Sequence, residues 1–394
     1  MVRPAGKSLC GRLMPNISSI ATFNACGMPT EPLKVLHISN ATTWRGGEQQ
    51  IAYIVEELAK HGVEQMMVVA HNSRMEDYCH KKGVSHVAVT KRWSVDPGVA
   101  KQIATAARQF KPHFLHAHDA QAHTSCLLAR LLFSCQTPLI LHRRVDFPIG
   151  KTLLSRYKYN HPQLVRMICV SEAIKQVVGP VIQDKNKLTV VHSGVDPDKF
   201  NKRPEHRLRQ EFAIPSDCKL VGNSAALTGH KDYYTFLRTA RNIIKQQPKT
   251  YFFIMGNGEL YDDLIHYRNQ LGLIESVIFT GFRDDIHQVL PELDVLLFTS
   301  EMEGLGTTVL DAYAAGVPVV ATRAGGIPEM VEEGKTALLA DVKDAEGLAS
   351  HVLRVLEEPE VSNQLIANGY RILQHFTKEQ MAKRLLSVYQ TVAQ

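Results

Sequence analysis

The stretch from residue 294 to residue 322 constrains the fold more than any other part of this chain of 394 residues. Its first apolar run predicts a buried strand over 294–298, and the spacing of apolar residues over 307–315 predicts a helix. Glycines lie in the turn between the two, and a second apolar run over 317–322 predicts another strand. Strand, glycine-containing turn and helix are the unit of a doubly wound α/β sheet, so this is the fold class that we expect.

The same turn has the features of a phosphate site. Backbone N–H groups in the first turn of a helix have no partner within the helix, and the helix dipole favours an anion there. Glu303 and Asp311 place a carboxylate at each end of this turn, eight positions apart. Glu303 suits a sugar hydroxyl and Asp311 a ribose hydroxyl, so we expect a sugar nucleotide as ligand. The alternative is structural, because acidic residues near the start of a helix also complement its dipole.

The alternation of strand and helix recurs along the chain and divides into two series. The first opens with a strand predicted over 33–39, a glycine-rich turn and a helix over 51–61. The second holds the stretch described above. We therefore predict two Rossmann-like domains, 33–200 and 201–377, with the boundary in the polar, proline-bearing stretch 193–217.

Residues 1–32 look separate from the fold. They contain no acidic residue before Glu31, and their apolar run is too short and interrupted for a secretory signal. We predict a disordered leader there.

Composition excludes several classes of protein. No apolar run approaches the ~20 residues that span a bilayer, so we expect a soluble protein. Seven cysteines, an odd number without a C-x-x-C pair, indicate a reducing, cytoplasmic compartment and argue against a disulfide framework or a structural zinc site. A net charge of +6 is too small to indicate nucleic-acid binding.

One segment, residues 141–166, holds six basic residues against a single acid, with apolar and aromatic residues between them. A solvated helix face is one interpretation of such a segment. The other is a surface that meets anionic lipid or an anionic acceptor, with Arg143 and Arg144 among its cations.

The string S-E-M-E-G-L-G-T-T-V-L-D over 300–311, followed by G-G-I-P-E at 325–329, resembles the donor-binding signature of the retaining family 4 glycosyltransferases. The resemblance extends from residue 33 to residue 394 and implies the GT-B fold, in which two Rossmann-like domains face each other across a cleft. It also implies that a helix over 378–392 packs back on the first domain. Asp311 stands where the family has Glu, which should weaken or reposition its ribose contact.

The resemblance implies roles for single residues. Lys231 matches the lysine that neutralises the diphosphate, but Ala226 replaces the arginine expected five positions earlier. His118 matches the histidine that contacts the transferred sugar; taken alone, the spacing of His116 and His118 also permits a metal site. The other positions expected beside the donor are Gly46, Gly47, Gly256, Gly258, Arg283, Gly304, Leu305, Gly306, Thr307 and Thr308.

Some of these positions have alternative interpretations. Gly46 and Gly47 alone are weak evidence for a ligand, and without G-x-G-x-x-G a dinucleotide is unsupported. Arg283 either stacks on the base or caps the surface. Asp196-Pro-Asp198 has the form of a metal-binding D-x-D triplet, but it matches the family's hinge segment, so no metal is expected.

These features together predict a retaining glycosyltransferase without a separate cofactor. It would move a hexosyl unit from a nucleoside diphosphate sugar, UDP-linked in preference to GDP-linked, to a glycan or lipid-linked acceptor in cell-envelope synthesis. The diphosphate would leave toward Lys231 and the amides of residues 305–308, without a covalent intermediate. We also expect peripheral contact of the protein with the inner face of an anionic membrane. Two alternatives stay open: a nucleotide-sugar epimerase, and a binding protein without turnover.

Overall fold

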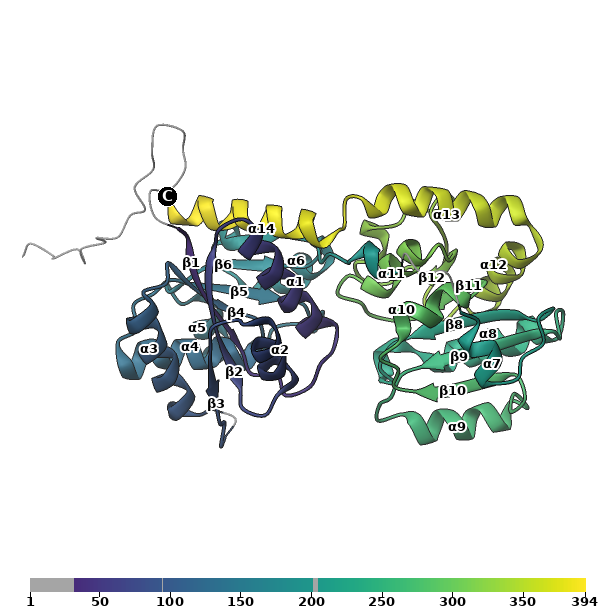
Figure 1. The fold of residues 1–394 in the computed structure, drawn as a ribbon, viewed down its shortest axis with the longest axis horizontal. Coiled ribbons are helices and arrows are strands. Elements are labelled where there is room, and N and C mark those ends of the chain that lie inside the picture. Colours follow the sequence, from purple (N-terminus) through teal and green to yellow (C-terminus); the bar gives the residue numbers. More distant parts are fainter. Residues whose placement is uncertain (1–31, 94, 201–204) are drawn as a thin grey trace, which may run out of the picture.

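The computed structural model describes residues 32–93, 95–200 and 205–394. The predicted disordered leader, 1–32, lies outside the described residues except for its last position. The described chain forms two parallel α/β units side by side, the first coloured purple to teal and the second teal to yellow (Figure 1). These two sheets confirm the predicted fold class. No helix in the described ranges is both long and apolar enough to cross a membrane.

The first unit is a seven-stranded parallel sheet in the order β3-β2-β1-β4-β5-β6-β7. β1, which lies between β2 and β4, has five buried residues out of six, as expected for a strand covered on both faces. The strands are β1 (Lys34–Ser39), β2 (Glu64–Ala70), β3 (His86–Val89), β4 (Phe114–Ala117), β5 (Leu139–Arg143), β6 (Leu164–Cys169) and β7 (Leu188–Val190). The helices are α1 (Gly46–Lys60), α2 (Arg74–Lys82), α3 (Pro97–Phe110), α4 (Ala120–Phe133), α5 (Leu153–Asn160) and α6 (Glu172–Val178).

The second unit is a six-stranded parallel sheet in the order β10-β9-β8-β11-β12-β13. The stretch 193–217, predicted as a plain connection, holds a helical turn at Pro197–Phe200 and a short helix. The strands are β8 (Lys219–Ser224), β9 (Thr250–Met255), β10 (Val277–Gly281), β11 (Val295–Phe298), β12 (Val319–Thr322) and β13 (Ala337–Ala340). The helices are α7 (Arg207–Glu211), α8 (Tyr233–Ile244), α9 (Tyr261–Gln270), α10 (Ile286–Val289), α11 (Thr307–Ala315), α12 (Ala345–Glu357) and α13 (Pro359–Leu373).

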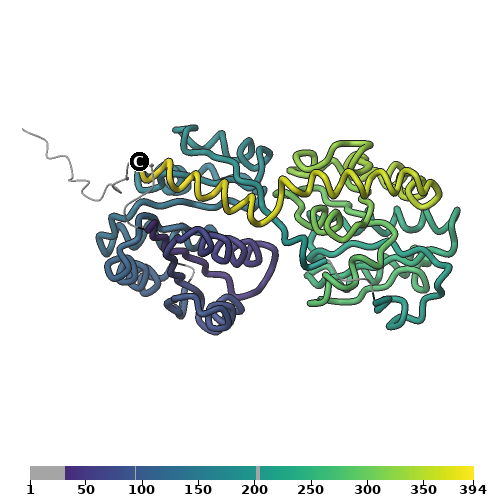
Figure 2. The backbone as a smooth tube through the Cα atoms, turned by 45° about the horizontal axis from the view of Figure 1, so that its top comes forward, coloured from purple at the N-terminus to yellow at the C-terminus, as the bar shows by residue number. Residues whose placement is uncertain are grey.

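The C-terminal helix α14 (Lys378–Ala393) leaves the second unit and lies along the first, as the yellow ribbon shows in both overall views (Figures 1 and 2). Met381, Leu385 and Tyr389 belong to the same apolar cluster as Phe114 in β4. The rings of Tyr389 and Phe114 are stacked with centroids 5.9 Å apart. The core of the first unit is therefore completed by the last residues of the chain.

Strand order reverses between β1 and β4 in the first sheet and between β8 and β11 in the second. In open α/β sheets, ligands bind beyond the carboxyl ends of the strands at such a reversal. The turns after these four strands carry Gly46, His118, Lys231 and Glu303. The fold thus indicates a site at these four turns.

Candidate functional site

The turns after β8 and β11 bring a cation and a carboxylate together. Lys231 ends the helical turn Gly229–Lys231, and its ammonium group forms an ion pair with Glu303 Oε1. Ser300 Oγ donates a 3.0 Å hydrogen bond to the same oxygen. The two paired side chains are only 17% and 9% exposed. A cation and a carboxylate held in this way can serve a departing phosphate and a sugar hydroxyl, respectively.

The helix beside this pair has an open N-terminus. α11 begins after Gly306, whose φ of 89° lies in the left-handed region that glycine adopts without steric cost. Among the described residues, no side chain caps this helix, so the amides of residues 305–308 are available to an anion. Thr308 Oγ1 donates instead to the carbonyl oxygen of Ser224 at 3.3 Å, which ties the turn to the end of β8.

Gly256 and Gly258 shape the loop that carries Lys231. A Cβ built on Gly256 would lie 2.0 Å from the carbonyl oxygen of Ala225, and one built on Gly258 would lie 2.3 Å from that of Leu227. The backbone after β9 therefore packs directly on the backbone after β8. These glycines are required by this close approach, whether or not a nucleotide lies beside them.

Asp311 lies one turn into α11. This helix contacts the turn Pro197–Phe200, in the segment that connects the two units. Burial raises the pKa of its carboxyl group to about 7, and the cation of Lys199 in the turn Pro197–Phe200 opposes this shift. Tyr53 of α1 is also close enough for Asp311 to affect its pKa. A carboxyl group with this pKa can either accept or donate a hydrogen bond near neutral pH.

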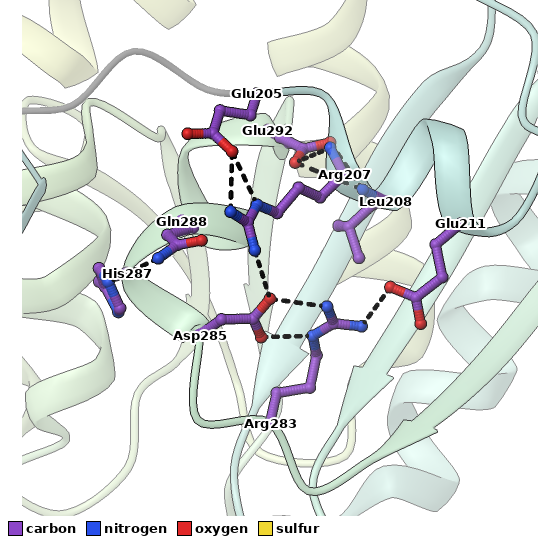
Figure 3. A network of polar contacts seen from close by, with 9 residues as sticks. All are labelled: Glu205, Arg207, Leu208, Glu211, Arg283, Asp285, His287, Gln288 and Glu292. Carbon is purple, nitrogen blue, oxygen red and sulfur yellow. Dashed lines mark hydrogen bonds and ion pairs between the residues drawn. The ribbon is translucent and has the colours of Figure 1, made fainter.

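Arg283 is held in an ion-pair network of the second unit (Figure 3). Its guanidinium donates to both carboxylate oxygens of Asp285 at 2.8 Å and to Glu211 Oε2 at 2.8 Å. The side chain is only 12% exposed. The arrangement matches the surface-capping alternative, because stacking on a base would require the guanidinium to leave two carboxylates.

Arg144, the residue after β5, brings the first unit into the same site. Its Nη1 donates to the carbonyl oxygen of His118 at 3.1 Å, and its Nη2 donates to the ring Nδ1 of His118 at 3.2 Å. A Cβ built on Gly47 would lie 3.9 Å from Arg144 Cδ, and one built on Gly304 would lie 2.5 Å from the carbonyl oxygen of Arg144. Arg144 therefore joins predicted site residues of both units.

Arg144 forms no ion pair with any described residue. Its Nε is buried without a hydrogen-bond partner, and both groups that it does contact are uncharged acceptors of His118. Burial lowers the pKa of Arg144 to about 10, although Glu48 and Asp119 oppose the shift from a distance. The guanidinium therefore stays cationic at neutral pH, and a partly buried cation without an ion pair among the described residues favours an anionic ligand.

His118 has both ring nitrogens engaged. Its Nε2 lies 2.9 Å from Nδ1 of His37, whose Nε2 lies 3.1 Å from Gln65 Oε1. Arg144 is a donor and Gln65 Oε1 an acceptor, so these contacts assign neutral rings that carry the proton on Nε2. Burial lowers the pKa of His37 to about 4 and that of His118 well below its usual value, with His116 and Arg144 adding to the second shift. The sugar contact predicted for His118 would require its ring to release one of these partners.

The same chain of hydrogen bonds bears on the metal alternative. Donor atoms of His37, His116 and His118 lie within 4.8 Å of one another, and Nε2 of His116 is buried without a partner. However, a cation at this place would compete with the guanidinium of Arg144 for the lone pair and the space beside His118. The geometry suits a hydrogen-bonded chain of neutral imidazoles better than a metal site.

Glu329, the acid of the G-G-I-P-E segment, connects the two units. Its carboxylate accepts hydrogen bonds from the backbone N–H groups of Glu172 and Ala173 at 2.8 Å, and it lies 2.9 Å from Nε2 of His192. Burial alone would raise the pKa of Glu329, but these hydrogen bonds outweigh it and hold the pKa below its usual value. The second unit thereby caps the first turn of α6 in the first.

The prediction that residues 141–166 form an outward-facing basic surface is wrong for Arg143 and Arg144. The segment is not one helix but the end of β5, a loop, α5 and the start of β6. Arg143 is only 8% exposed and donates to the carbonyl oxygen of Phe147, while Arg144 turns to His118. The sequence reading missed both Arg144 and Glu329 as site residues. The available signal was that Arg144 follows the predicted strand 139–143, at the edge where the sheet binds ligands.

Comparisons with known proteins agree with this geometry. The model "Glycosyltransferase Family 4" matches residues 44–199, and the model "Glycosyl transferases group 1" matches residues 204–372. N-acetyl-alpha-D-glucosaminyl L-malate synthase of Bacillus anthracis is 23% identical over 80% of this chain and 83% of its own length. The lipopolysaccharide core biosynthesis glycosyltransferase LpsE of Rhizobium meliloti is 28% identical over 83% of this chain and 90% of its own.

Among solved structures, Anabaena HepE in complex with UDP and glucose superposes with a TM-score of 0.80 at 19% identity, over 91% of this chain and 100% of that one. A galactosyltransferase of the lipopolysaccharide outer core, WaaB, superposes with a TM-score of 0.68 at 16% identity, over 90% and 98% of the two chains. The two family models together match most of the chain, one for each unit. The protein belongs to the retaining glycosyltransferases of family 4, also described as glycosyl transferases group 1, and has the GT-B fold.

Proposed function

We propose that the protein transfers a hexosyl unit from a UDP-sugar to a hydroxyl of a glycan or lipid-linked acceptor, in the synthesis of a cell-envelope polysaccharide or glycolipid. One observation carries this proposal: Lys231 and Glu303 form an ion pair beside the open N-terminus of α11. UDP as the carrier is supported by HepE, which was solved with UDP and with UDP-glucose. The envelope role is supported by relatives that act in lipopolysaccharide core synthesis.

In the proposed reaction, the bond between the anomeric carbon and the β-phosphate oxygen breaks, and its electron pair passes to that oxygen. Lys231 and the amides of residues 305–308 stabilise the charge that develops there. Glu303 accepts a hydrogen bond from the transferred sugar. The acceptor oxygen forms its new bond on the same face of the sugar, and its proton passes to the departing phosphate oxygen.

Arg144 supplies the second cation in this proposal. Ala226 removes the arginine that the family resemblance places in the second unit. The backbone carbonyl of Arg144 packs against Gly304 of the second unit, its guanidinium lies at His118, and its charge has no ion-pair partner among the described residues. A diphosphate bound between Lys231 and Arg144 would therefore hold the two units together.

Thermal unfolding with UDP, GDP and ADP tests the donor site. A nucleotide at 100 times its dissociation constant adds roughly 2.7 kcal/mol to the free energy of unfolding. We expect UDP to raise the melting temperature more than GDP or ADP does. Stabilisation by none of them would favour the binding protein without turnover, whose site has degenerated. Conversion of a UDP-sugar to its epimer without any acceptor would favour the epimerase.

We further propose that α5 contacts the cytoplasmic face of an anionic membrane, where a lipid-linked acceptor would lie. Leu153 and Leu154 are 84% and 75% exposed, and the exposed Lys151 and Arg156 flank them. Apolar side chains beside basic ones are the composition of an interfacial helix.

Replacing Leu153 and Leu154 together by serine should weaken binding to phosphatidylglycerol vesicles by about tenfold or more, because two leucines no longer enter the apolar layer. Vesicle co-sedimentation measures this. The matched control replaces Leu131 and Leu132 of α4, which are 53% and 55% exposed, by serine. Equal loss in both double variants, or none in either, would contradict a specific role for α5.

A further inference from the structure

A cavity of about 890 Å³ lies in the first unit, apart from the Lys231–Glu303 pair. It is bounded by the residues that follow β1, β2 and β3 and by the first residues of α4. Its position is therefore the carboxyl edge of the sheet, next to the reversal of strand order between β1 and β4. Its volume is within the range of small-molecule sites.

Residues in the wall of the cavity are direct sequence neighbours of residues at the donor site. Arg45, in its wall, directly precedes Gly46 and Gly47, and Asp119, also in its wall, directly follows His118. His118 is held by Arg144, and Gly47 lies against Arg144. A molecule in this cavity would thus lie on the first unit's side of the place where a sugar would be transferred.

Three cations line the cavity without a carboxylate partner. Lys91 donates to an uncharged oxygen, Oε1 of Gln121, at 2.5 Å. Among the ion pairs of the described residues, none includes Arg45, Lys91 or Arg92. Three positive charges that line one cavity without an ion pair favour an anionic ligand there.

Among the described residues that line the cavity, Asp119 supplies the carboxylate, and backbone N–H groups occupy both of its oxygens. Asp119 Oδ2 accepts from the backbone N–H of Asn40 at 2.9 Å. Its Oδ1 accepts from the N–H groups of Gln121 and Ala122 at 2.9 and 2.7 Å. Asp119 therefore serves as the cap of α4 and ties it to the turn after β1.

Trp93 adds an apolar contact at the edge of the cavity. Trp93 directly follows Arg92 in the sequence, and its side chain is 64% exposed. A large exposed ring beside a cavity is typical of a ligand-binding surface, and an indole can lie against the apolar face of a sugar ring. The cavity thus offers an apolar surface together with cations, as a charged sugar requires.

We propose that this cavity binds the acceptor and that the acceptor is a sugar or polyol bearing an anionic group, a phosphate or a carboxylate, which Arg45, Lys91 and Arg92 hold. This inference rests on the proposed function, because it assigns the acceptor of the same transfer. It locates the recognition of the acceptor's own anionic group in this cavity. A neutral acceptor would leave the three cations without an ionic partner.

Calorimetric titration of the full chain in the presence of saturating UDP tests the assignment. The probes are glucose 6-phosphate, glucuronate, inorganic phosphate and glucose. We expect at least one of the two charged sugars to bind about tenfold or more tightly than glucose, because hydrogen bonds to charged groups are the strong ones. Tighter binding of glucose 6-phosphate would identify a phosphate as the anionic group, and tighter binding of glucuronate a carboxylate.

The double variant K91A/R92A should lose this preference about tenfold while its affinity for UDP stays unchanged. K91R/R92K, which keeps both charges, should retain it. The matched control K81A/K101A removes two exposed lysines outside the cavity and should bind all probes like the wild type.

Four results would overturn the inference. With UDP binding intact, equal binding of glucose and both charged sugars would remove the anionic acceptor, and a preference that survives K91A/R92A would remove Lys91 and Arg92 as the residues that hold it. Binding of inorganic phosphate as tight as that of the charged sugars would show a phosphate site that does not recognise a sugar. Failure of the wild type to bind UDP would instead overturn the proposed function itself, and the acceptor assignment with it.

Discussion

Replacing Lys231 by alanine should lower the rate of sugar transfer by about 10²- to 10³-fold, the usual cost of removing one group that stabilises a developing negative charge. The ammonium group lies at the end of β8, in contact with Glu303 and beside the open N-terminus of α11. Without it, the leaving diphosphate keeps the backbone amides but loses a full positive charge. The affinity for UDP should fall by about tenfold or more for the same reason.

The measurement is the initial rate of UDP release from a UDP-sugar with acceptor, together with calorimetric binding of UDP. Lys335→Ala is the matched control, because Lys335 is 67% exposed and, among the described residues, forms an ion pair with the exposed Glu332 three positions before it. Lys231→Ala also leaves Glu303, which is 9% exposed, without its cation. The melting temperature of the variant must therefore be measured, to separate a loss of stability from a loss of function. The double variant Lys231→Ala/Glu303→Gln removes that unpaired charge. A folded Lys231→Ala protein with wild-type rate and UDP affinity would contradict the role of Lys231.

Replacing Arg144 by methionine should lower UDP affinity by about tenfold and the transfer rate further, without a matching loss of stability. A partly buried charge without an ion pair costs some free energy in the unliganded protein, and methionine fills a similar volume. The pKa of His118 should rise in the variant, because the charge of Arg144 is one of the causes that hold it low. A residue with a purely structural role would show the opposite, a lower melting temperature with unchanged UDP affinity.

Thermal unfolding with and without UDP measures both effects in one experiment. We expect the melting temperature of the unliganded Arg144→Met protein to equal or exceed that of the wild type, and its increase on adding UDP to be smaller. Arg371→Ala is the control for the loss of one charge, since Arg371 is exposed on α13. An unchanged UDP response in Arg144→Met would leave Lys231 and the amides of residues 305–308 as sufficient for the diphosphate.

The sequence alone predicted the elements whose signals are local. A strand, a turn and a helix at 294–315 are properties of neighbouring residues, because apolar periodicity and unpaired backbone donors depend on a few positions. The structure confirms the parallel α/β class and places β11 and α11 there.

Only the tertiary structure decided which side chains share a site. Arg283 could not be assigned from sequence because one of its partners, Glu211, lies 72 positions away. His116 and Tyr389, 273 positions apart, meet only because α14 returns to the first sheet. Arg144 has the composition of a surface residue, yet the end of β5 directs it to His118. Contacts at such separations depend on strand order and on the path of the chain between the units, which no local pattern of residues contains.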